Sequence, residues 1–355
     1  MSDPHRRLLF VLANGGRGGM QSQVRLIAGG LAERGHEVTI AVGPGDFAPV
    51  PGTMLVQLPA FSPRRPWRFL RELRRVLRVV RPDVTHGHGL RLAPLLRLAR
   101  APHPIVSCHG IDPDRARRTL EAVRLSGVFA VACGEGPRRV MARHGVTAHV
   151  INNAVATPAT WSTRDELCRR FELDGTRPIA ILPARFSEQK NHHLLLSALR
   201  AVRHELGDRA PDVLCFGDGP LVAEICAAAR VPGDRPLLDY RPYVADASHW
   251  FGGCDFFILP SRWEGQPLVV LEALAAGLSV VTSTESGVED LVLDGVNGRR
   301  VSGAAGLADT IVEWCKDPTS RPTNVDTTRE ILALHELPVV LTAYEQLYAD
   351  RCGSR

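Results

Sequence analysis

Two carboxylates, Glu264 and Glu272, lie eight positions apart in the otherwise apolar stretch of residues 261–277. Burying a carboxylate is costly unless a partner binds it. Gly265-Gln266-Pro267 separates the two acids, and proline favours the first helical position. We therefore expect Glu264 in a loop and Glu272 on a helix that begins at Pro267, with the free N–H groups of its first turn between them. This layout suits a nucleotide sugar, because acids bind hydroxyls and a helix N-terminus binds phosphate.

Two cations, Arg185 and Lys190, are separated by four residues in the same half of the chain. Such a pair on the two sides of a turn can clamp a diphosphate and neutralise the charge of a leaving group. Two solvated surface cations would give the same pattern. However, 41 of the 43 basic residues are Arg, and Lys190 is one of only two lysines. A lysine retained in such a background favours a role for its compact ammonium group.

Two glycine-rich loops precede helical patterns. Four glycines lie within residues 14–19, where the backbone could approach an anion closely. The dinucleotide fingerprint G-x-G-x-x-G is not met, because Gln21 occupies the third glycine position. Gly217-Asp218-Gly219-Pro220 forms a second tight turn, which ordinary punctuation between a strand and a helix explains equally well.

The elements that position these loops alternate between apolar runs and helical patterns. With 45% apolar and 23% charged residues, the composition is that of an ordinary globular protein. Strand, helix, strand in repetition predicts parallel sheets covered on both faces, which bind ligands at the carboxyl ends of their strands. The strands expected are residues 8–12, 37–42, 83–86, 104–108, 128–133 and 149–151, then 178–182, 213–216, 255–259 and 279–282.

A chain of 355 residues is expected to form two domains, which a Thr- and Pro-containing stretch near residues 156–161 would join. We expect residues 1–158 to form the first domain and 159–337 the second. Thr163 and Glu166 predict a capping box at the first helix of the second domain. No apolar run is long enough to span a bilayer, residues 1–5 lack a signal-peptide pattern, and eight scattered cysteines favour reduced thiols. These features favour a cytoplasmic protein.

Together these motifs resemble those of the retaining glycosyltransferases of family 4. The Glu-x7-Glu segment of residues 264–272 is the most specific of them, followed by Arg185-x4-Lys190, the turn at residues 217–220 and the early glycine loop. The resemblance implies the GT-B fold, an α/β architecture of two Rossmann-like, doubly wound domains that face one another across a cleft. It also implies that residues 338–355, with Tyr344 and Tyr348 one helical turn apart, form a helix that crosses back to the first domain.

The resemblance implies roles for the matching residues. The catalytic set would be Arg185 and Lys190 at the donor diphosphate, Glu264 at the donor sugar and His109 facing the reacting sugar. Glu272 would bind the ribose, and the other donor contacts would be Gly16, Gly18, Gly19, Gly217, Gly219, Gly265, Gln266, Pro267 and Leu268. By residue type alone, a lone histidine such as His109 is more often structural. His86 and His88 form a weaker candidate pair, and no third ligand indicates a metal site.

Three positions depart from the usual family pattern. Asn152-Asn153-Ala154 stands where many members have Pro-Asn-Gly, Gln266 replaces a frequent Phe, and Met20-Gln21 follows the glycine loop in place of a small residue and Glu. The last two departures lie where the family binds the donor sugar or acceptor. The candidate acceptor-binding residues are His88, Met20, Gln21 and Asn153.

The activity implied is transfer of a sugar, with retention of configuration, from a UDP-sugar or a GDP-sugar to a hydroxyl of a small-molecule, glycan or lipid-linked acceptor. No cofactor, no metal and no nucleic acid is expected. Three alternatives use the same residues differently. Glu264 and Glu272 could be a glycosidase pair, although a loop and a helix in a parallel α/β domain suit that poorly. The fold could also serve a non-catalytic nucleotide-sugar-binding protein, or an oxidoreductase that would need the missing glycine fingerprint.

Residues 64–81 contain eight arginines and one acid around an apolar stripe. One hypothesis is peripheral contact with an anionic membrane, at its inner face, or with a lipid-phosphate acceptor. The simpler interpretation is a packed helix whose outer face is rich in Arg because of a coding bias.

Overall fold

The computed structural model describes residues 5–244 and 246–353. Contacts divide the chain into two compact units. Unit 1 comprises Met1–Ala156 and Leu334–Arg355, and unit 2 comprises Thr157–Ala333. Each unit has its own parallel sheet and its own buried apolar clusters. The expected α/β architecture of two doubly wound domains is therefore confirmed.

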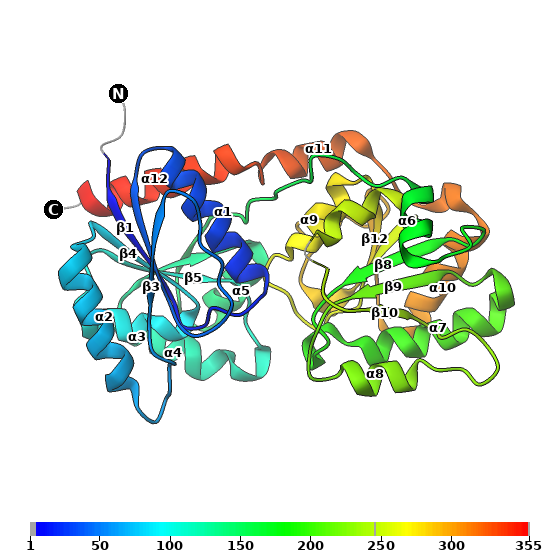
Figure 1. The fold of residues 1–355 in the computed structure, drawn as a ribbon, viewed down its shortest axis with the longest axis horizontal. Helices are drawn as coiled ribbons and strands as arrows, with labels where there is room; N and C mark the ends of the chain where they lie inside the picture. The colour runs from blue at the N-terminus through cyan, green and yellow to red at the C-terminus, as the bar shows by residue number, and fades with distance from the viewer. Residues whose placement is uncertain (1–4, 245, 354–355) are drawn as a thin grey trace. The chain divides into compact units, whose positions relative to one another are not determined.

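Unit 1 is built on a seven-stranded sheet in the order β3-β2-β1-β4-β5-β6-β7 (Figure 1). Its strands are β1 (Arg7–Leu12), β2 (Glu37–Val42), β3 (Thr53–Gln57), β4 (Val84–His88), β5 (Pro104–Cys108), β6 (Phe129–Ala132) and β7 (Ala148–Val150). Its helices are α1 (Gly19–Glu33), α2 (Pro66–Val80), α3 (Ala93–Ala99), α4 (Ala116–Ser126), α5 (Glu135–Arg143) and α12 (Leu337–Gly353). The apolar sides of α1 and α12 pack on one side of the sheet and those of α2 and α3 on the other.

Unit 2 is built on a six-stranded sheet in the order β10-β9-β8-β11-β12-β13. Its strands are β8 (Ile179–Pro183), β9 (Asp212–Phe216), β10 (Asp239–Arg241), β11 (Phe256–Leu259), β12 (Ser279–Ser283) and β13 (Gly298–Val301). Its helices are α6 (Arg164–Phe171), α7 (His192–Leu206), α8 (Val222–Ala228), α9 (Leu268–Ala275), α10 (Gly303–Lys316) and α11 (Val325–Ala333). The predicted capping box at Thr163 and Glu166 is present at the start of α6.

Sequence signals placed the central strands within a few residues of their observed bounds. They missed β3, β10 and β13, which are edge strands with weaker apolar patterns. An edge strand has a neighbour on one side only, so its side chains are less uniformly buried than those of a central strand.

Both sheets reverse their strand order at one place, between β1 and β4 in unit 1 and between β8 and β11 in unit 2. The loops that leave neighbouring strands diverge at such a switch point and leave a crevice for a ligand. The predicted glycine loop follows β1, and the predicted cations and Glu264 follow β8 and β11. The topology therefore brings the predicted residues of each unit to the edge of the sheet where α/β proteins bind ligands.

Candidate functional site

In unit 2 the loops after β8 and β11 are joined directly. The side-chain amide of Gln189 donates to the Trp263 carbonyl at 2.9 Å, and the Arg262 N–H donates to the Gln189 carbonyl at 2.9 Å. These bonds join two loops that are about 70 residues apart in sequence. They therefore hold Lys190, on the first loop, close to Glu264, on the second.

Lys190 and Glu264 form a largely buried ion pair. Lys190 Nζ lies 2.6 Å from Glu264 Oε1, and the two side chains are 16% and 6% exposed. Removing one member of a buried pair typically costs about 3–5 kcal/mol, because the other charge is left without a partner. Such an ion pair is a strong local constraint, and it fixes the ammonium and the carboxylate before any ligand arrives.

The turn at residues 217–220 supports the loop that carries Arg185. A Cβ atom on Gly217 would lie 2.1 Å from the Ala184 carbonyl oxygen, and one on Gly219 would lie 2.2 Å from the Phe186 carbonyl oxygen. The Phe186 N–H donates to the Asp218 carbonyl at 2.9 Å. Glycine is thus required at both positions so that two backbones can pack against each other, with Arg185 between the contacts.

Arg185 differs from its neighbours because it is exposed, and no carboxylate of the described residues forms an ion pair with it. Phe186, the next residue, is fully buried and anchors the loop. A guanidinium without an internal partner can donate to a ligand without first breaking an ion pair. Arg185 and Lys190 therefore offer one free cation and one that is already positioned.

Helix α9 begins at Leu268, and Pro267 is the residue before it, with φ −71° and ψ 121°. The expectation that Pro267 is the first helical residue is corrected by one position, because its ψ is extended. The Glu264 N–H donates to the Ser286 carbonyl at 2.8 Å, and Gly265, Gln266 and Pro267 are buried. Glu264 thus lies in the loop and Glu272 on the helix, as their spacing predicts.

Glu272 lies on α9 and is half-buried. No hydrogen bond or ion pair is formed by its side chain within the described residues. Burial raises the pKa of this carboxyl from 4.5 to about 7. An acid that is unpaired and costly to ionise is a candidate for binding a ligand, because ligand hydroxyls could supply the missing donors.

This raised pKa predicts a pH-dependent stability difference. The folded protein holds the proton more tightly than the unfolded chain, so ionisation of Glu272 destabilises the fold as pH rises from about 4.5 to 7, with the full cost above pH 7. Glu272→Gln should raise the free energy of unfolding at pH 8 by up to about 3 kcal/mol. Urea denaturation at pH 8 and pH 4.5 should show this gain disappearing at the lower pH. The exposed Glu285→Gln should show no such difference, and an equal gain for Glu272→Gln at both values would contradict the assignment.

His192, at the start of α7, was not among the predicted site residues. It is fully buried and stacks on Phe186 with ring centroids 4.1 Å apart, and neither ring nitrogen has a hydrogen-bond partner in the described chain. Burial and the nearby Lys190 charge lower its pKa to about 4. The signal in the sequence that could have identified it is its position two residues after Lys190. However, a histidine within a helical pattern is usually interpreted as an ordinary core residue.

In unit 1 three histidines form a row, with His86 and His88 on β4 and His109 directly after β5. His86 stacks on His88 with centroids 4.4 Å apart, and His88 Nδ1 lies 3.0 Å from His109 Nε2. Burial lowers the pKa of His86 to about 3, that of His109 to about 4 and that of His88 well below its ordinary value, so the rings are neutral at pH 7. One neutral ring therefore donates to the next, and Nδ1 of His109 has no partner in the described chain.

This row is also tied to the C-terminal helix. His86 Nδ1 lies 2.8 Å from the Tyr348 hydroxyl of α12, and its Nε2 lies 2.7 Å from Ser107 Oγ. Tyr344 and Tyr348 are both buried on the same side of the sheet. The helix thus fixes the orientation of His86, on which His88 stacks, and His88 in turn contacts His109.

Two parts of unit 1, the glycine loop and residues 153–154, are held by side chains that are not among the predicted site residues. Asn14 Oδ1 accepts from the Gly16 N–H at 2.6 Å, and α1 starts at Gly19. The buried Gln23 binds both backbone groups of Ala154, and His335 Nδ1 lies 2.8 Å from the Asn153 carbonyl. The acceptor-binding candidates Met20 and Gln21 occupy the first turn of α1, with Met20 next to Gly89, and His88 ends β4.

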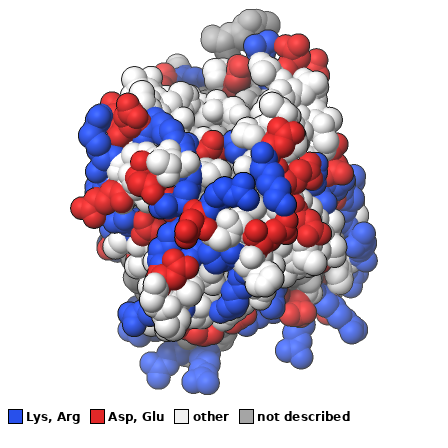
Figure 2. Space-filling model, turned by 90° about the vertical axis from the view of Figure 1, so that its right-hand side faces the viewer, with Lys and Arg blue, Asp and Glu red and all other residues white. Residues whose placement is uncertain are grey.

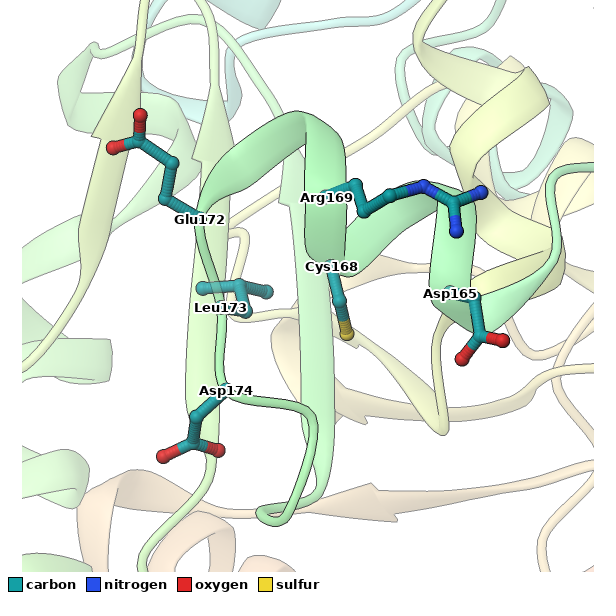
Figure 3. Close-up of a pocket in the computed structure, with 6 residues that line it drawn as sticks. All are labelled: Asp165, Cys168, Arg169, Glu172, Leu173 and Asp174. Carbon is teal, nitrogen blue, oxygen red and sulfur yellow. The ribbon is translucent and has the colours of Figure 1, made fainter.

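The pocket in Figure 3 has a volume of about 610 Å³ and is lined by Asp165, Cys168, Arg169, Glu172, Leu173 and Asp174. The residues belong to α6 and the turn after it, and the carboxyl groups of Asp165 and Glu172 point in different directions (Figure 3). None of the predicted site residues lines it. Within residues 5–244 and 246–353, no group of three or more His, Cys, Asp or Glu side chains is placed to hold a metal ion.

Comparisons with known families match both halves of the chain. Residues 17–157 match the model described as "Glycosyltransferase Family 4", and residues 177–317 match that of "Glycosyl transferases group 1". EpsF of Bacillus subtilis, named as a glycosyltransferase, is 27% identical over 317 residues, which cover 80% of each chain. The alpha-maltose-1-phosphate synthase of Mycobacterium tuberculosis is 26% identical over 254 residues, which cover 61% of this chain and 64% of that protein.

Among solved structures, HepE of Anabaena in complex with UDP and glucose has the same fold. The TM-score is 0.82 and the identity 16%, and the match covers 98% of this chain and 100% of HepE. Sucrose-phosphate synthase of Thermosynechococcus elongatus gives a TM-score of 0.81 at 16% identity. These structures share the GT-B fold with this chain.

Proposed function

The chain belongs to the family 4 glycosyltransferases, with the GT-B fold, and we propose that it transfers a sugar from a nucleoside-diphosphate sugar to an acceptor hydroxyl with retention of configuration. The observation that carries this proposal is the largely buried pair of Lys190 and Glu264, with Lys190 on a loop that also carries Arg185, which is exposed and forms no ion pair within the described residues. A preorganised ammonium and a free guanidinium on one loop suit a leaving diphosphate, and the carboxylate paired with the ammonium suits sugar hydroxyls.

In this proposal the leaving group is stabilised by protein charge. Arg185 and Lys190 bind the diphosphate, and the N–H groups of the first turn of α9 add partial positive charge near Leu268. Because charge accumulates on the diphosphate as the glycosidic bond breaks, donors fixed in advance lower the barrier without reorganising. Turnover should then persist in excess EDTA, since these groups take the place of a metal ion.

The two glutamates have separate roles in this proposal. Glu264, on the loop, accepts hydrogen bonds from donor-sugar hydroxyls while it stays paired with Lys190. Glu272, on α9, accepts from the ribose hydroxyls. Binding of those hydroxyls would offset part of the cost of ionising Glu272, so nucleotide binding should lower the pKa of this carboxyl from its raised value near 7.

The donor is proposed to be a UDP-sugar, because HepE, which has the same fold, was solved with UDP and glucose. A thermal-shift panel of UDP-, GDP-, ADP- and TDP-sugars tests this. At a concentration about 100 times the dissociation constant, the correct donor should raise Tm by about 5 °C or more. A larger shift with a GDP-sugar would reassign the base.

The acceptor is proposed to bind unit 1, with the neutral His109 facing the reacting sugar and with His88, Met20, Gln21 and Asn153 near the acceptor. Two assays test the reaction itself. Product made with the identified donor should have the anomeric configuration of that donor by NMR. Donor binding without transfer or hydrolysis, across a panel of glycan and lipid-linked acceptors, would instead indicate a non-catalytic nucleotide-sugar-binding protein.

A further inference from the structure

The two units carry opposite net charge. Unit 1 contains 25 basic residues, all Arg, against 13 acids, whereas unit 2 contains 18 basic residues against 25 acids. A coding bias toward Arg replaces lysines but does not remove Asp and Glu. The same bias acts on both units, and only unit 1 has the excess of about twelve positive charges. The excess of positive charge is therefore a property of unit 1 and does not result from the coding bias.

Much of this charge lies on neighbouring helices. α2, α3 and α4 lie side by side along one side of unit 1 (Figure 1), and Arg74 of α2 donates to the Leu98 carbonyl of α3 at 2.8 Å. All eight arginines of residues 64–81 are exposed, and exposed arginines continue on the other two helices, including Arg97 and Arg124. We call the exposed residues of 64–81, α3 and α4 the arginine surface. By contrast, basic and acidic side chains are interspersed on the face in Figure 2.

The inner side of α2, the first helix of this surface, is packed. α2 buries Phe69, Leu73 and Val76 against the sheet and α3. The apolar stripe in the sequence is therefore a packing stripe, and the arginines lie opposite to it. Within the described residues of 64–81, one internal ion pair is formed, between Arg75 and Glu72 at 2.9 Å. The remaining guanidinium groups have no carboxylate to neutralise them there.

Large apolar side chains are exposed among these cations. Trp67 is 61% exposed and Val79 75% on α2, Leu98 is 58% exposed on α3, and Leu125 is 73% exposed on α4. Single exposed apolar residues are common on any surface. Their presence on three adjacent helices, next to unneutralised arginines, is the pattern of an interfacial surface, where apolar groups enter the acyl boundary and cations meet headgroup phosphates.

We propose that the arginine surface of unit 1 binds the surface of an anionic phospholipid bilayer. None of the helices in the described part of the chain has the length and apolar character that crossing a membrane requires, so the contact is peripheral. Each basic residue near an anionic surface contributes about fivefold to partitioning, and the attraction weakens with salt. Trp67 adds an aromatic ring at headgroup depth. This proposal concerns a surface and does not depend on the roles assigned to Lys190 and Glu264.

The test is sedimentation of the full chain with vesicles of phosphatidylglycerol and phosphatidylcholine, compared with phosphatidylcholine alone. The wild type should bind the anionic vesicles at low salt and be released at high salt. Arg68→Gln, Arg71→Gln and Arg78→Gln combined should weaken partitioning by about 100-fold. The matched control replaces three exposed arginines of unit 2 with Gln, at Arg169, Arg209 and Arg230. It has the same net charge as the first triple variant, but it should bind the anionic vesicles like the wild type.

Trp67→Ser tests the apolar contribution and should weaken vesicle binding several-fold without changing Tm, because the side chain is exposed. Three results would overturn the proposal: wild type that does not sediment, equal losses in the two triple variants, and unchanged binding by Trp67→Ser. Binding to duplex DNA in preference to the vesicles would also overturn it and identify a general polyanion surface. Circular dichroism and Tm confirm that each variant is folded.

Discussion

Lys190→Ala should lower kcat by roughly 10²–10³-fold, because it removes a preorganised donor from the leaving diphosphate. The ammonium already lies 2.6 Å from Glu264 and is largely buried, so no other cation of this loop can replace it without rearrangement. Steady-state transfer assays with the correct donor measure the loss. Lys190→Arg should restore little, since a planar guanidinium does not fit a site shaped by a compact ammonium.

The chain offers a matched control for this variant. Lys316 is the other lysine, and its ammonium pairs with Glu205 at 2.5 Å with both side chains about half exposed. Lys316→Ala removes the same charge and an ion pair of similar length, yet it should leave kcat unchanged and alter stability little. Near-normal turnover by a folded Lys190→Ala protein would refute the role proposed for this residue.

Glu264→Ala should abolish most turnover as well, with a loss of roughly 10²-fold or more in kcat/KM. The carboxylate is 6% exposed, and the variant leaves Lys190 without its partner. A loss of stability of about 3 kcal/mol is therefore expected alongside the loss of activity. Tm must be measured first, and Glu264→Gln, which keeps the side-chain volume, serves where the alanine variant is unstable. Glu188→Ala, an exposed acid two residues before Lys190, should change neither quantity.

The double variant shows whether the two residues act together in one site or independently of each other. If Lys190 and Glu264 act as a unit, Lys190→Ala combined with Glu264→Ala should cost little more activity than either change alone. Losses that multiply would mean that each residue contributes to turnover independently of the other. Normal turnover by a folded Glu264→Ala or Glu264→Gln protein would contradict the assigned role directly.

The fold was largely predictable because its signals are local. The apolar runs of β1, β8 and β11 are fully buried central strands, and Thr163 with Glu166 forms the predicted cap. The Glu-x7-Glu spacing also predicted that one acid lies in a loop and the other on α9. Edge strands β3, β10 and β13 were missed because they are incompletely buried, so their sequences lack the continuous apolar pattern of a central strand.

By itself, the sequence determined the alternation of strands and helices, the loops that could bind anions and the family pattern of Arg185, Lys190, Glu264 and Glu272. These depend on neighbours within about ten residues, where propensity and spacing act. Only the tertiary structure decided that Lys190 pairs with Glu264 across 74 positions, that the half-buried Glu272 has no hydrogen-bond or ion-pair partner within the described residues and that His88 contacts His109. Contacts of this kind depend on strand order, and burial depends on everything packed around a group, so no short stretch of sequence contains them.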